Sequence, residues 1–339
     1  MRICVFVLVV AACLGAPAAA WAYSDVVPGA TEDSAEVETA IFYYPWFGTA
    51  DRDGAFTHWH GGKAPPDFIA SDYYPVRGPY SSADTLVLAA QMQEIAAAGV
   101  STVIVSWWGR GSVADERVPL VLAAARVYGL AVAAHVEPYA DRTVDSVTAD
   151  IAYLRTLGIA DFYVWSSVWL PDAEWAAMNA GLTGTRVFAN TNLPGKAASG
   201  GFDGVYTYDV LLYNGRLFAR LCAQAHRLRL LCAPSVGPGY DARRATGDTR
   251  LKPRRDGATY DGMWSGAIRA QADVITVTSY NEWHEGTQIE PARHGKSGYE
   301  SYEGAWGLSG PAAERSYLER TGYWTARFAR ARSGLALGP

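Results

Sequence analysis

Two glutamates three residues apart, Glu282 and Glu285, lie in the segment TSYNEWHEGTQIEPA (278–292), and a third, Glu290, follows closely. The apolar run ADVITV just before it predicts a buried strand, so the pair follows a strand end. Two carboxyl groups can hydrolyse a glycosidic bond when one is a general acid and the other a base or nucleophile. Because residues three apart on a strand face opposite ways, NEWHEG must curl if both are to enter one pocket.

Each candidate catalytic or binding residue also has an explanation that involves no function. Neighbouring glutamates in an exposed turn are usually solvated surface charges. His58 and His60, in the stretch HWH, lack a nearby Asp or Cys set, so no metal site is expected there. His135, taken alone, is better explained as a hydrogen-bonded core histidine. The GPG stretch at 237–239 predicts a tight loop rather than a phosphate cradle.

Short apolar, β-branched or aromatic runs alternate with helical patterns along the chain. There are eight such runs, at 40–47, 100–108, 130–139, 161–167, 185–192, 202–209, 229–237 and 272–280. Strands this continuously apolar predict an α/β fold with a parallel sheet covered on both faces. Eight repeats favour a single-domain (β/α)8 TIM barrel. A doubly wound open sheet is the alternative, although the first run is not followed by a GxGxxG turn.

A barrel of this kind presents its chemistry at the carboxyl ends of its strands. Polar and aromatic residues gather at almost every predicted strand end, among them Tyr44, Trp46, Trp108, His135, Glu137, Tyr139, Trp165, Tyr208, Asn281 and the glutamate pair. Sugars stack their apolar faces on Trp and Tyr, so this ring suits a carbohydrate groove. Core packing accounts equally well for most of the 12 Trp and 20 Tyr.

The charge, the N-terminal segment and the cysteines indicate where the protein is located and what it binds. The net charge of −5 has no basic stripe, so nucleic acid is not an expected partner. The first 22 residues, MRICVFVLVVAACLGAPAAAWA, predict a signal peptide cleaved after Ala22. Lipidation at Cys13 or an uncut anchor are the alternatives. A linker at 23–38 and a catalytic domain at 39–335 should follow, in a secreted or periplasmic protein. Cys222 and Cys232 are expected to be buried free thiols, since a bridge is allowed but not forced.

Eight ordered motifs between Tyr43 and Glu290 closely resemble those of glycoside hydrolase family 99, the endo-α-mannosidases and endo-α-1,2-mannanases. The motifs read YYPWFG, HWH, GPYSSAD, SWW, HVEPY, GFDGVYTY, PSVGPGY and TSYNEWHEGTQIE. The resemblance implies a (β/α)8 hydrolase that cuts within α-mannose-containing oligo- or polysaccharides with retention of configuration. It implies no metal or organic cofactor, and we expect a monomer.

The resemblance also assigns roles by position. Glu282 would be the base that deprotonates the sugar's own 2-hydroxyl, which attacks C1 and gives a 1,2-anhydro sugar. Glu285 would be the general acid and then the base that activates water. Sugar binding would fall to Tyr44, Trp46, His58, Trp108, His135, Glu137, Tyr139, Tyr208, Tyr240, Arg250, Asn281 and Trp283.

Two stretches depart from the family pattern. VWSSVW stands where the family tends to have YDS after the fourth strand, and DVLLYNG after Tyr208 is shorter than usual. Trp108 resembles the bacterial mannanase type. The departures concern the outer sugar subsites and leave two alternatives, an inactive carbohydrate-binding homologue and a glycosidase that uses another glycan or a direct nucleophile.

Overall fold

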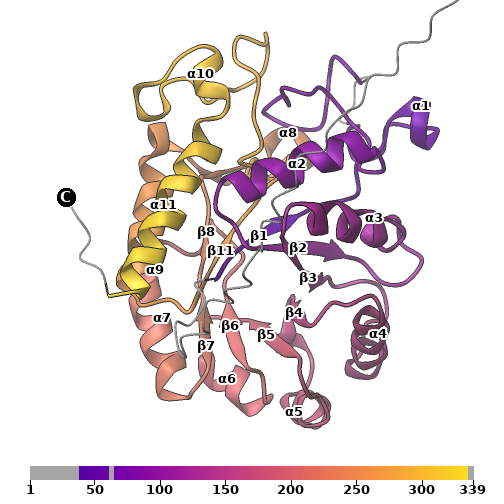
Figure 1. Ribbon diagram of the computed structural model, residues 1–339, viewed down its shortest axis with the longest axis vertical. Helices are drawn as coiled ribbons and strands as arrows, with labels where there is room; N and C mark the ends of the chain where they lie inside the picture. Colours follow the sequence, from indigo (N-terminus) through magenta and orange to yellow (C-terminus); the bar gives the residue numbers. More distant parts are fainter. Residues whose placement is uncertain (1–37, 61–64, 335–339) are drawn as a thin grey trace, which may run out of the picture. The chain divides into compact units, whose positions relative to one another are not determined.

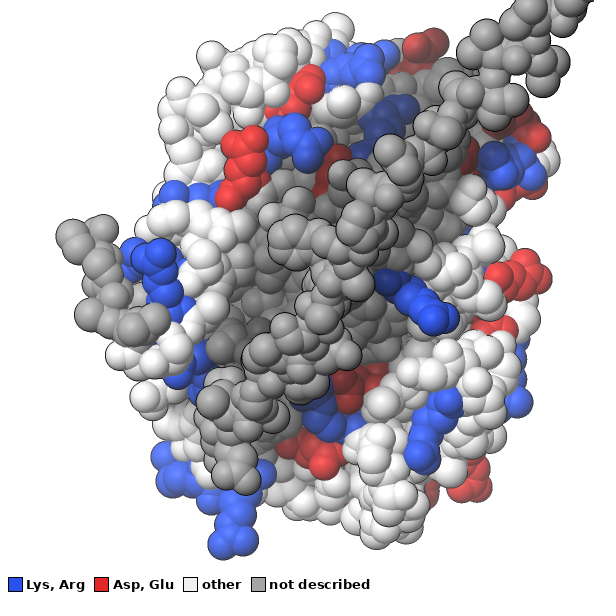
Figure 2. All heavy atoms as spheres, in the orientation of Figure 1, with Lys and Arg blue, Asp and Glu red and all other residues white. Residues whose placement is uncertain are grey.

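A computed structural model describes residues 38–60 and 65–334, and Figure 1 labels the elements. The expected signal peptide, Cys13 and all but the last residue of the expected linker lie outside the described residues. None of the helices in the described part of the chain is long and apolar enough to cross a membrane. On the face drawn in Figure 2, Lys and Arg lie among Asp and Glu, without one continuous basic band outside the grey atoms.

Nine parallel strands form the main sheet, in the order β7-β6-β5-β4-β3-β2-β1-β11-β8. They are β1 Glu38–Tyr43, β2 Thr102–Trp107, β3 Ala131–Val136, β4 Asp161–Val164, β5 Arg186–Asn190, β6 Gly204–Tyr206, β7 Leu231–Ala233, β8 Ser235–Val236 and β11 Val274–Val277. The two edge strands, β7 and β8, are separated along the chain only by Pro234. The edges of the sheet therefore meet, and the predicted (β/α)8 barrel is confirmed, whereas the open doubly wound alternative is wrong.

Pro234 explains why the seventh barrel strand is divided in two. Proline has no N–H to give to a neighbouring strand, so the ladder is interrupted there. The next residue, Ser235, donates its N–H to the Thr207 hydroxyl at 3.1 Å instead. On the other side, the carbonyls of Cys232, Pro234 and Val236 accept from the β11 segment, which keeps the barrel closed.

The barrel interior is filled by aromatic side chains. Phe42 on β1 lies 6.0 Å from Tyr163 on β4 and 5.9 Å from Tyr206 on β6, measured between ring centroids. Tyr163 stacks on Phe188 of β5 at 4.7 Å. All four are fully buried, so the barrel is a packed core, and a ligand can enter only at its ends.

Helices surround the barrel, as Figure 1 shows. The longer ones are α2 Thr85–Ala97, α3 Val113–Val127, α4 Val144–Thr156, α5 Asp172–Ala180, α6 Pro194–Ser199, α7 Gly215–Arg227, α9 Ala258–Arg269 and α11 Ser316–Arg332. Side chains of Asp84, Ser112, Thr143 and Asn214 cap α2, α3, α4 and α7. The sequence did not single out α5 and α6, which are short, at nine and six residues.

Three loop regions stand over the carboxyl ends of the strands. The loop after β1 pairs with the loop after β11 at Tyr73–Glu300 and Pro75–Ala292. The third is an antiparallel hairpin of β9 Tyr240–Asp241 and β10 Leu251–Lys252, which we call the β9–β10 hairpin. Short helices α1 Ala50–Asp53, α8 Arg243–Thr246 and α10 Pro311–Glu314 lie within these regions.

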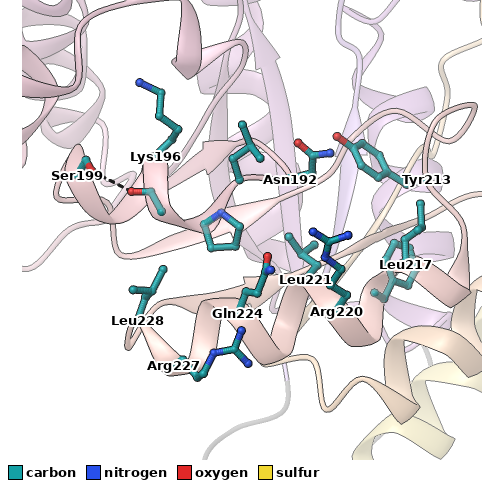
Figure 3. A pocket seen from close by; sticks show the side chains of 14 residues that line it. Asn192, Lys196, Ser199, Tyr213, Leu217, Arg220, Leu221, Gln224, Arg227 and Leu228 are labelled. Atoms are coloured by element: carbon teal, nitrogen blue, oxygen red, sulfur yellow. Dashed lines mark hydrogen bonds between the residues drawn. The ribbon is translucent and has the colours of Figure 1, made fainter.

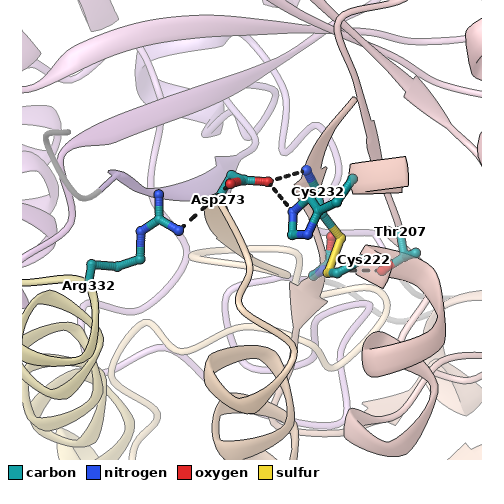
Figure 4. Close-up of a disulfide and its surroundings, with 7 residues drawn as sticks. Thr207, Cys222, Cys232, Asp273 and Arg332 are labelled. Carbon is teal, nitrogen blue, oxygen red and sulfur yellow. Dashed lines mark hydrogen bonds and ion pairs between the residues drawn. A yellow bond between two sulfur atoms is a disulfide. The ribbon is translucent and has the colours of Figure 1, made fainter. Parts of the chain in front are cut away.

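The expectation of free thiols is wrong, because Cys222 of α7 is bonded to Cys232 of β7 (Figure 4). Both cysteines are fully buried, since the inner face of α7 packs on the strand that follows it. Asp273 lies beside the disulfide and accepts from the Cys232 N–H and from His226 Nε2, both at 2.8 Å. Arg332, in the last turn of α11, is 3.7 Å from the same carboxylate.

Candidate active site

A cavity of about 170 Å³ opens at the carboxyl ends of the strands, with room on the order of one sugar ring. It brings together residues that lie at the ends of six different barrel strands or just after them. Its lining is Tyr44, Trp46, Trp108, His135, Glu137, Pro138, Trp165, Tyr208, Glu282 and Glu285. Three carboxyl groups and five Trp and Tyr rings thus face one small space.

The two glutamates reach this cavity because the chain turns sharply after β11. We call residues 281–286 the NEWHEG turn. Glu282 N donates to Ser279 Oγ at 2.8 Å, Trp283 N to Asn281 O at 3.0 Å, and Gly286 N to Trp283 O at 3.4 Å. The curl brings Glu282 and Glu285 to the same side, whereas an extended strand would send them to opposite sides.

Gly286 lets the turn lie against the β9–β10 hairpin. Its φ is +62°, and a Cβ there would lie 2.7 Å from Asp241 O and 3.0 Å from Asp241 N. Asp241 N donates to Glu285 O at 2.8 Å. Only glycine permits this backbone and this approach together, so the hairpin helps to fix the peptide of Glu285.

Burial raises the pKa of both glutamates. Glu282 is 3% exposed, and its pKa lies well above the usual range because of burial and then the charge of Glu285. Burial raises the pKa of Glu285 to about 7, although the Tyr208 hydroxyl and Arg250 act in the opposite direction. Since two charges so close in a dry site repel each other, the pair holds a proton near neutral pH.

The hydrogen bonds of the two carboxyl groups differ. Glu282 Oε1 accepts the peptide N–H of His284 at 3.0 Å. Glu285 Oε2 accepts from the Tyr208 hydroxyl at 3.1 Å, and that hydroxyl is bonded to the Tyr44 hydroxyl at 2.5 Å. A peptide N–H can only donate, whereas a hydroxyl can donate or accept, so only Glu285 has a neighbour suited to either of its protonation states.

Asn281 joins the turn to the end of β1. Its Oδ1 accepts from Tyr44 N at 2.8 Å, and its Nδ2 donates to Tyr44 O at 3.0 Å. The side chain is fully buried, beneath the cavity rather than in its lining. These two hydrogen bonds fix the backbone of Tyr44, whose hydroxyl is bonded to Tyr208.

Glu137 contributes the third carboxyl group, from the opposite wall. Its Oε1 accepts from Ser106 Oγ at 2.8 Å and lies 2.9 Å from His135 Nδ1, where the angle is too poor for a hydrogen bond. His135 Nε2 is 2.8 Å from the Tyr206 hydroxyl. Ser106 Oγ also accepts from Trp108 Nε1 at 3.0 Å, so the network holds the Trp108 indole.

Trp46 and Trp108 form an aromatic wall beside the glutamates. Their ring centroids are 6.2 Å apart, and Trp108 is 38% exposed at the mouth. His58 stacks on Trp46 at 4.4 Å with an angle of 4° and lies outside the lining. Burial lowers the pKa of His58 to about 4, so it backs Trp46 as a neutral ring. The described residues hold no group of His, Cys, Asp and Glu placed to bind a metal ion.

Several expected binding residues lie away from the cavity lining. The Tyr139 hydroxyl faces α4, where it is bonded to Ser146 Oγ and Asp150. Trp283 is fully buried and donates its Nε1 to Glu290 at 2.9 Å. Tyr240 donates to Asp248 at 3.0 Å, and Arg250 pairs with the same Asp248. Both belong to the β9–β10 hairpin region, near enough to Glu285 for charge interactions.

Two lining residues were not among the expected binding residues. Trp165 stood at the end of the fourth predicted strand, so its position could have signalled it. Pro138 follows Glu137 and carried no such signal. Glu290, the third glutamate of the segment, lies beneath the turn and is held by Arg77, Tyr80, Gln91 and Trp283.

A larger cavity of about 810 Å³ lies outside the barrel between α6 and α7 (Figure 3). Leu, Pro and Phe side chains line it together with Asn192, Lys196, Arg220, Gln224 and Arg227. None of the described residues that line it is Asp, Glu or His, so they offer no acid and base pair for hydrolysis. Size alone therefore does not locate the chemistry.

Known proteins resemble this chain in sequence and in fold. The model of glycosyl hydrolase family 99 matches residues 35–330. A glycoprotein endo-alpha-1,2-mannosidase-like protein of Danio rerio is 33% identical, over 86% of this chain and 78% of its own length. The glycoprotein endo-alpha-1,2-mannosidase of Xenopus laevis is 30% identical, over 85% and 76%.

Among solved structures, the GH99 endo-alpha-mannosidase of Bacteroides thetaiotaomicron, in complex with bis-tris-propane, is similar with a TM-score of 0.79. It is 31% identical, over 88% of this chain and 98% of that one. A glycoside hydrolase-like protein at 12% identity and a TM-score of 0.61 shows the shared fold alone.

Proposed function

Because the chain belongs to glycosyl hydrolase family 99 and is therefore a glycoside hydrolase, we propose that it cleaves internal α-mannosidic bonds in oligo- or polysaccharides. One observation carries this proposal: a single turn after the last barrel strand brings Glu282 and Glu285 into a cavity lined by Trp and Tyr. Such a pair supplies the acid and the base that glycoside hydrolysis requires.

We assign the acid to Glu285 and the base to Glu282. Burial raises the pKa of Glu282 as well as that of Glu285, so the proton that the pair holds must be assigned to one of the two, and their hydrogen bonds favour Glu285. The peptide N–H of His284 favours the carboxylate form of Glu282. Glu285, with a pKa raised to about 7, can stay protonated and still lose its proton in the reaction.

The proposed reaction retains configuration through the sugar's own 2-hydroxyl. Glu282 takes the proton of that hydroxyl, whose oxygen attacks C1 as the bond from C1 to the departing oxygen breaks. Glu285 gives its proton to the departing oxygen, which leaves a 1,2-anhydro sugar. Glu285 then takes a proton from water, the water oxygen attacks C1 and opens the ring, and Glu282 returns its proton to the 2-oxygen.

The other lining residues suit the binding of the sugar. Trp46, Trp108 and Trp165 offer ring faces for stacking, and Trp108, which is exposed at the mouth, would meet the next sugar along the chain. Glu137 and His135 offer polar atoms to hydroxyl groups. Tyr240 and Arg250 on the β9–β10 hairpin region would contact the substrate beyond the cavity.

We also propose that the protein is exported and acts as a monomer. The Cys222–Cys232 disulfide supports export, because such bonds persist mainly in oxidising compartments.

The test measures sugars released by purified protein from an α-1,6-mannan with α-1,2 branches and from a glucosyl-α-1,3-mannosyl substrate. We expect a disaccharide from at least one substrate, and at least about a 100-fold loss in Glu282→Gln and in Glu285→Gln. Glu319→Gln, on the exposed face of α11, is the matched control and should keep full activity.

Two results would contradict parts of the proposal. If the folded protein released nothing from either substrate, the α-mannosidase activity would be wrong. If a glycosyl group were trapped on either glutamate, a direct nucleophile would replace the 2-hydroxyl route. The anomer of the fresh product, followed by NMR, distinguishes retention from inversion.

A further inference from the structure

We propose that Arg254 is a positioning residue for the proposed acid, Glu285, and that it acts through the backbone of the residues just after it. Arg254 lies two residues after β10, outside all eight sequence motifs that resemble the family. The inference rests on the proposed function, because it concerns how the acid of that reaction is held.

The guanidinium of Arg254 contacts the chain immediately beyond the NEWHEG turn. Its Nη2 donates to Gly286 O at 2.9 Å and to Gln288 O at 2.7 Å. These two carbonyls stand on either side of Thr287. A planar guanidinium bound to two carbonyls restrains both their distance and their direction, which a flexible point charge does not.

Three tyrosine rings hold the guanidinium in place. Its central carbon lies 4.7 Å from the Tyr73 ring centroid, 4.6 Å from that of Tyr302 and 4.6 Å from that of Tyr317. Tyr302 also donates its hydroxyl to Gln288 O at 3.0 Å and to Glu290 O at 2.8 Å. The three rings therefore surround the cation, and Tyr302 also binds the segment to which the cation donates.

No carboxylate forms a salt bridge with Arg254 among the described residues, and the groups around its guanidinium are the three tyrosines. Burying a cation in this way is costly, and an apolar side chain would fill the same cage at lower cost. An apolar side chain could not replace the hydrogen bonds that Arg254 donates to Gly286 O and Gln288 O.

The β9–β10 hairpin makes room for this arrangement. A Cβ on Gly239 would lie 2.9 Å from Arg254 Cγ and 2.7 Å from Lys252 O, so the arginine stem passes close over a residue without a side chain. Asp241 of the same hairpin donates its N–H to Glu285 O. Successive carbonyls, of Glu285 and of Gly286, are thus held by the hairpin and by Arg254.

Loss of these donors should let the peptide after Glu285 shift, while the aromatic walls that hold the sugar stay in place. A misplacement on the order of 1 Å can lower a catalytic rate by about 100-fold. We therefore expect Arg254→Met to lower kcat by about 10- to 100-fold with KM changed by less than about threefold. Glu285 should also become more hydrated, which moves the alkaline limb of the pH-rate profile to lower pH.

The experiment compares Arg254→Met, Arg254→Lys and the matched control Arg255→Met on the mannan that the wild-type protein cleaves. Arg255 is the exposed next residue, so its substitution should leave kcat and the pH-rate profile unchanged. Arg254→Lys keeps a cation among the tyrosines but not the fork of donors. It should fold and still lose at least about fivefold in kcat, since the ammonium cannot hold both carbonyls in one plane.

Folded fraction is measured by circular dichroism and thermal melting, and rates are given per folded molecule. Wild-type kcat and an unmoved alkaline limb in folded Arg254→Met would overturn the inference. So would full activity of Arg254→Lys, or failure of both variants to fold, which would make Arg254 a folding residue only. An inactive wild-type protein would instead count against the proposed function.

Discussion

Glu285 is tuned by a small number of groups that surround its carboxyl. Burial acts most strongly and raises its pKa, and the charges of Asp209 and Glu137 act in the same direction. The Tyr208 hydroxyl and Arg250 lower it. A raised pKa keeps Glu285 protonated up to a higher pH. Activity that needs protonated Glu285 should therefore be present at low pH and lost as the pH rises through this pKa.

We predict that kcat/KM falls about tenfold per pH unit above a pKa of about 7. Tyr208→Phe removes the hydroxyl that donates to Glu285 Oε2 and favours its ionised form. The pKa of Glu285 should then rise, and the alkaline limb should move to higher pH, measured from initial rates between pH 4 and 10.

Tyr213→Phe serves as the control, since Tyr213 lines the distant cavity between α6 and α7. Its alkaline limb should coincide with that of the wild-type protein. Movement of the Tyr208→Phe limb to lower pH would contradict the assignment of Glu285 as the group that limits activity at high pH.

At the level of elements, the NEWHEG turn depends on neighbours that are distant in the sequence. The turn is tied to β1 through Asn281 and Tyr44, and to the β9–β10 hairpin through Asp241. From below, Trp283 donates to the buried Glu290, which is also bound by Arg77. The turn therefore presents two glutamates rigidly although it belongs to no helix or strand.

We predict that Gly286→Ala disturbs this turn. Positive φ costs an alanine roughly 1–2 kcal/mol, and the new Cβ would press on the Asp241 backbone. Because Glu285 is the preceding residue, kcat should fall at least about tenfold, measured at a temperature where the variant is fully folded.

Gly129→Ala separates strain from catalysis. Gly129 also has a positive φ, of +69°, but nothing lies within 4 Å of its Cβ position. This variant should lose about 1 kcal/mol of stability with kcat unchanged. Equal kcat losses in the two variants would show that Gly286 has no special role.

At the scale of the whole molecule, the barrel closes at its seventh strand, which is divided into two short pieces. The seventh strand is divided by Pro234, and β7 and β8 are three and two residues long. The Cys222–Cys232 disulfide joins β7 to α7, and Asp273 connects the same region to β11 through the Cys232 N–H. A covalent link and a partly buried hydrogen bond thus reinforce the point where the edges of the sheet meet.

We predict that reduction of this disulfide lowers the free energy of unfolding by about 2–3 kcal/mol, the value expected for a loop of 10 residues. The urea midpoint should fall, while kcat in the absence of urea stays the same because both cysteines lie away from the cavity. Urea titrations with and without reductant measure the difference.

Cys222→Ala/Cys232→Ala, as a double variant, provides the control. Its urea midpoint should not respond to the reductant. Coinciding midpoints for the oxidised and reduced wild-type protein would show that packing alone holds α7 to the barrel.

The sequence by itself determined the eight-stranded barrel, because buried parallel strands are continuously apolar and alternate with amphipathic helices. It also placed Glu282 and Glu285 after the last strand, where this fold keeps its chemistry. Only the tertiary structure decided which strand-end residues face the cavity, since Trp165 lines it whereas Tyr139 faces α4. Side-chain direction in a loop follows local backbone angles, which leave no periodic trace.

The cysteine pairing and the position of Arg254 also required the tertiary structure. Pairing depends on which face of α7 meets β7, and the contact of Arg254 with Gly286 joins residues 32 positions apart. Local patterns encode elements, because each element buries its own face. Contacts between irregular loops arise only when the barrel has brought those loops to the same end.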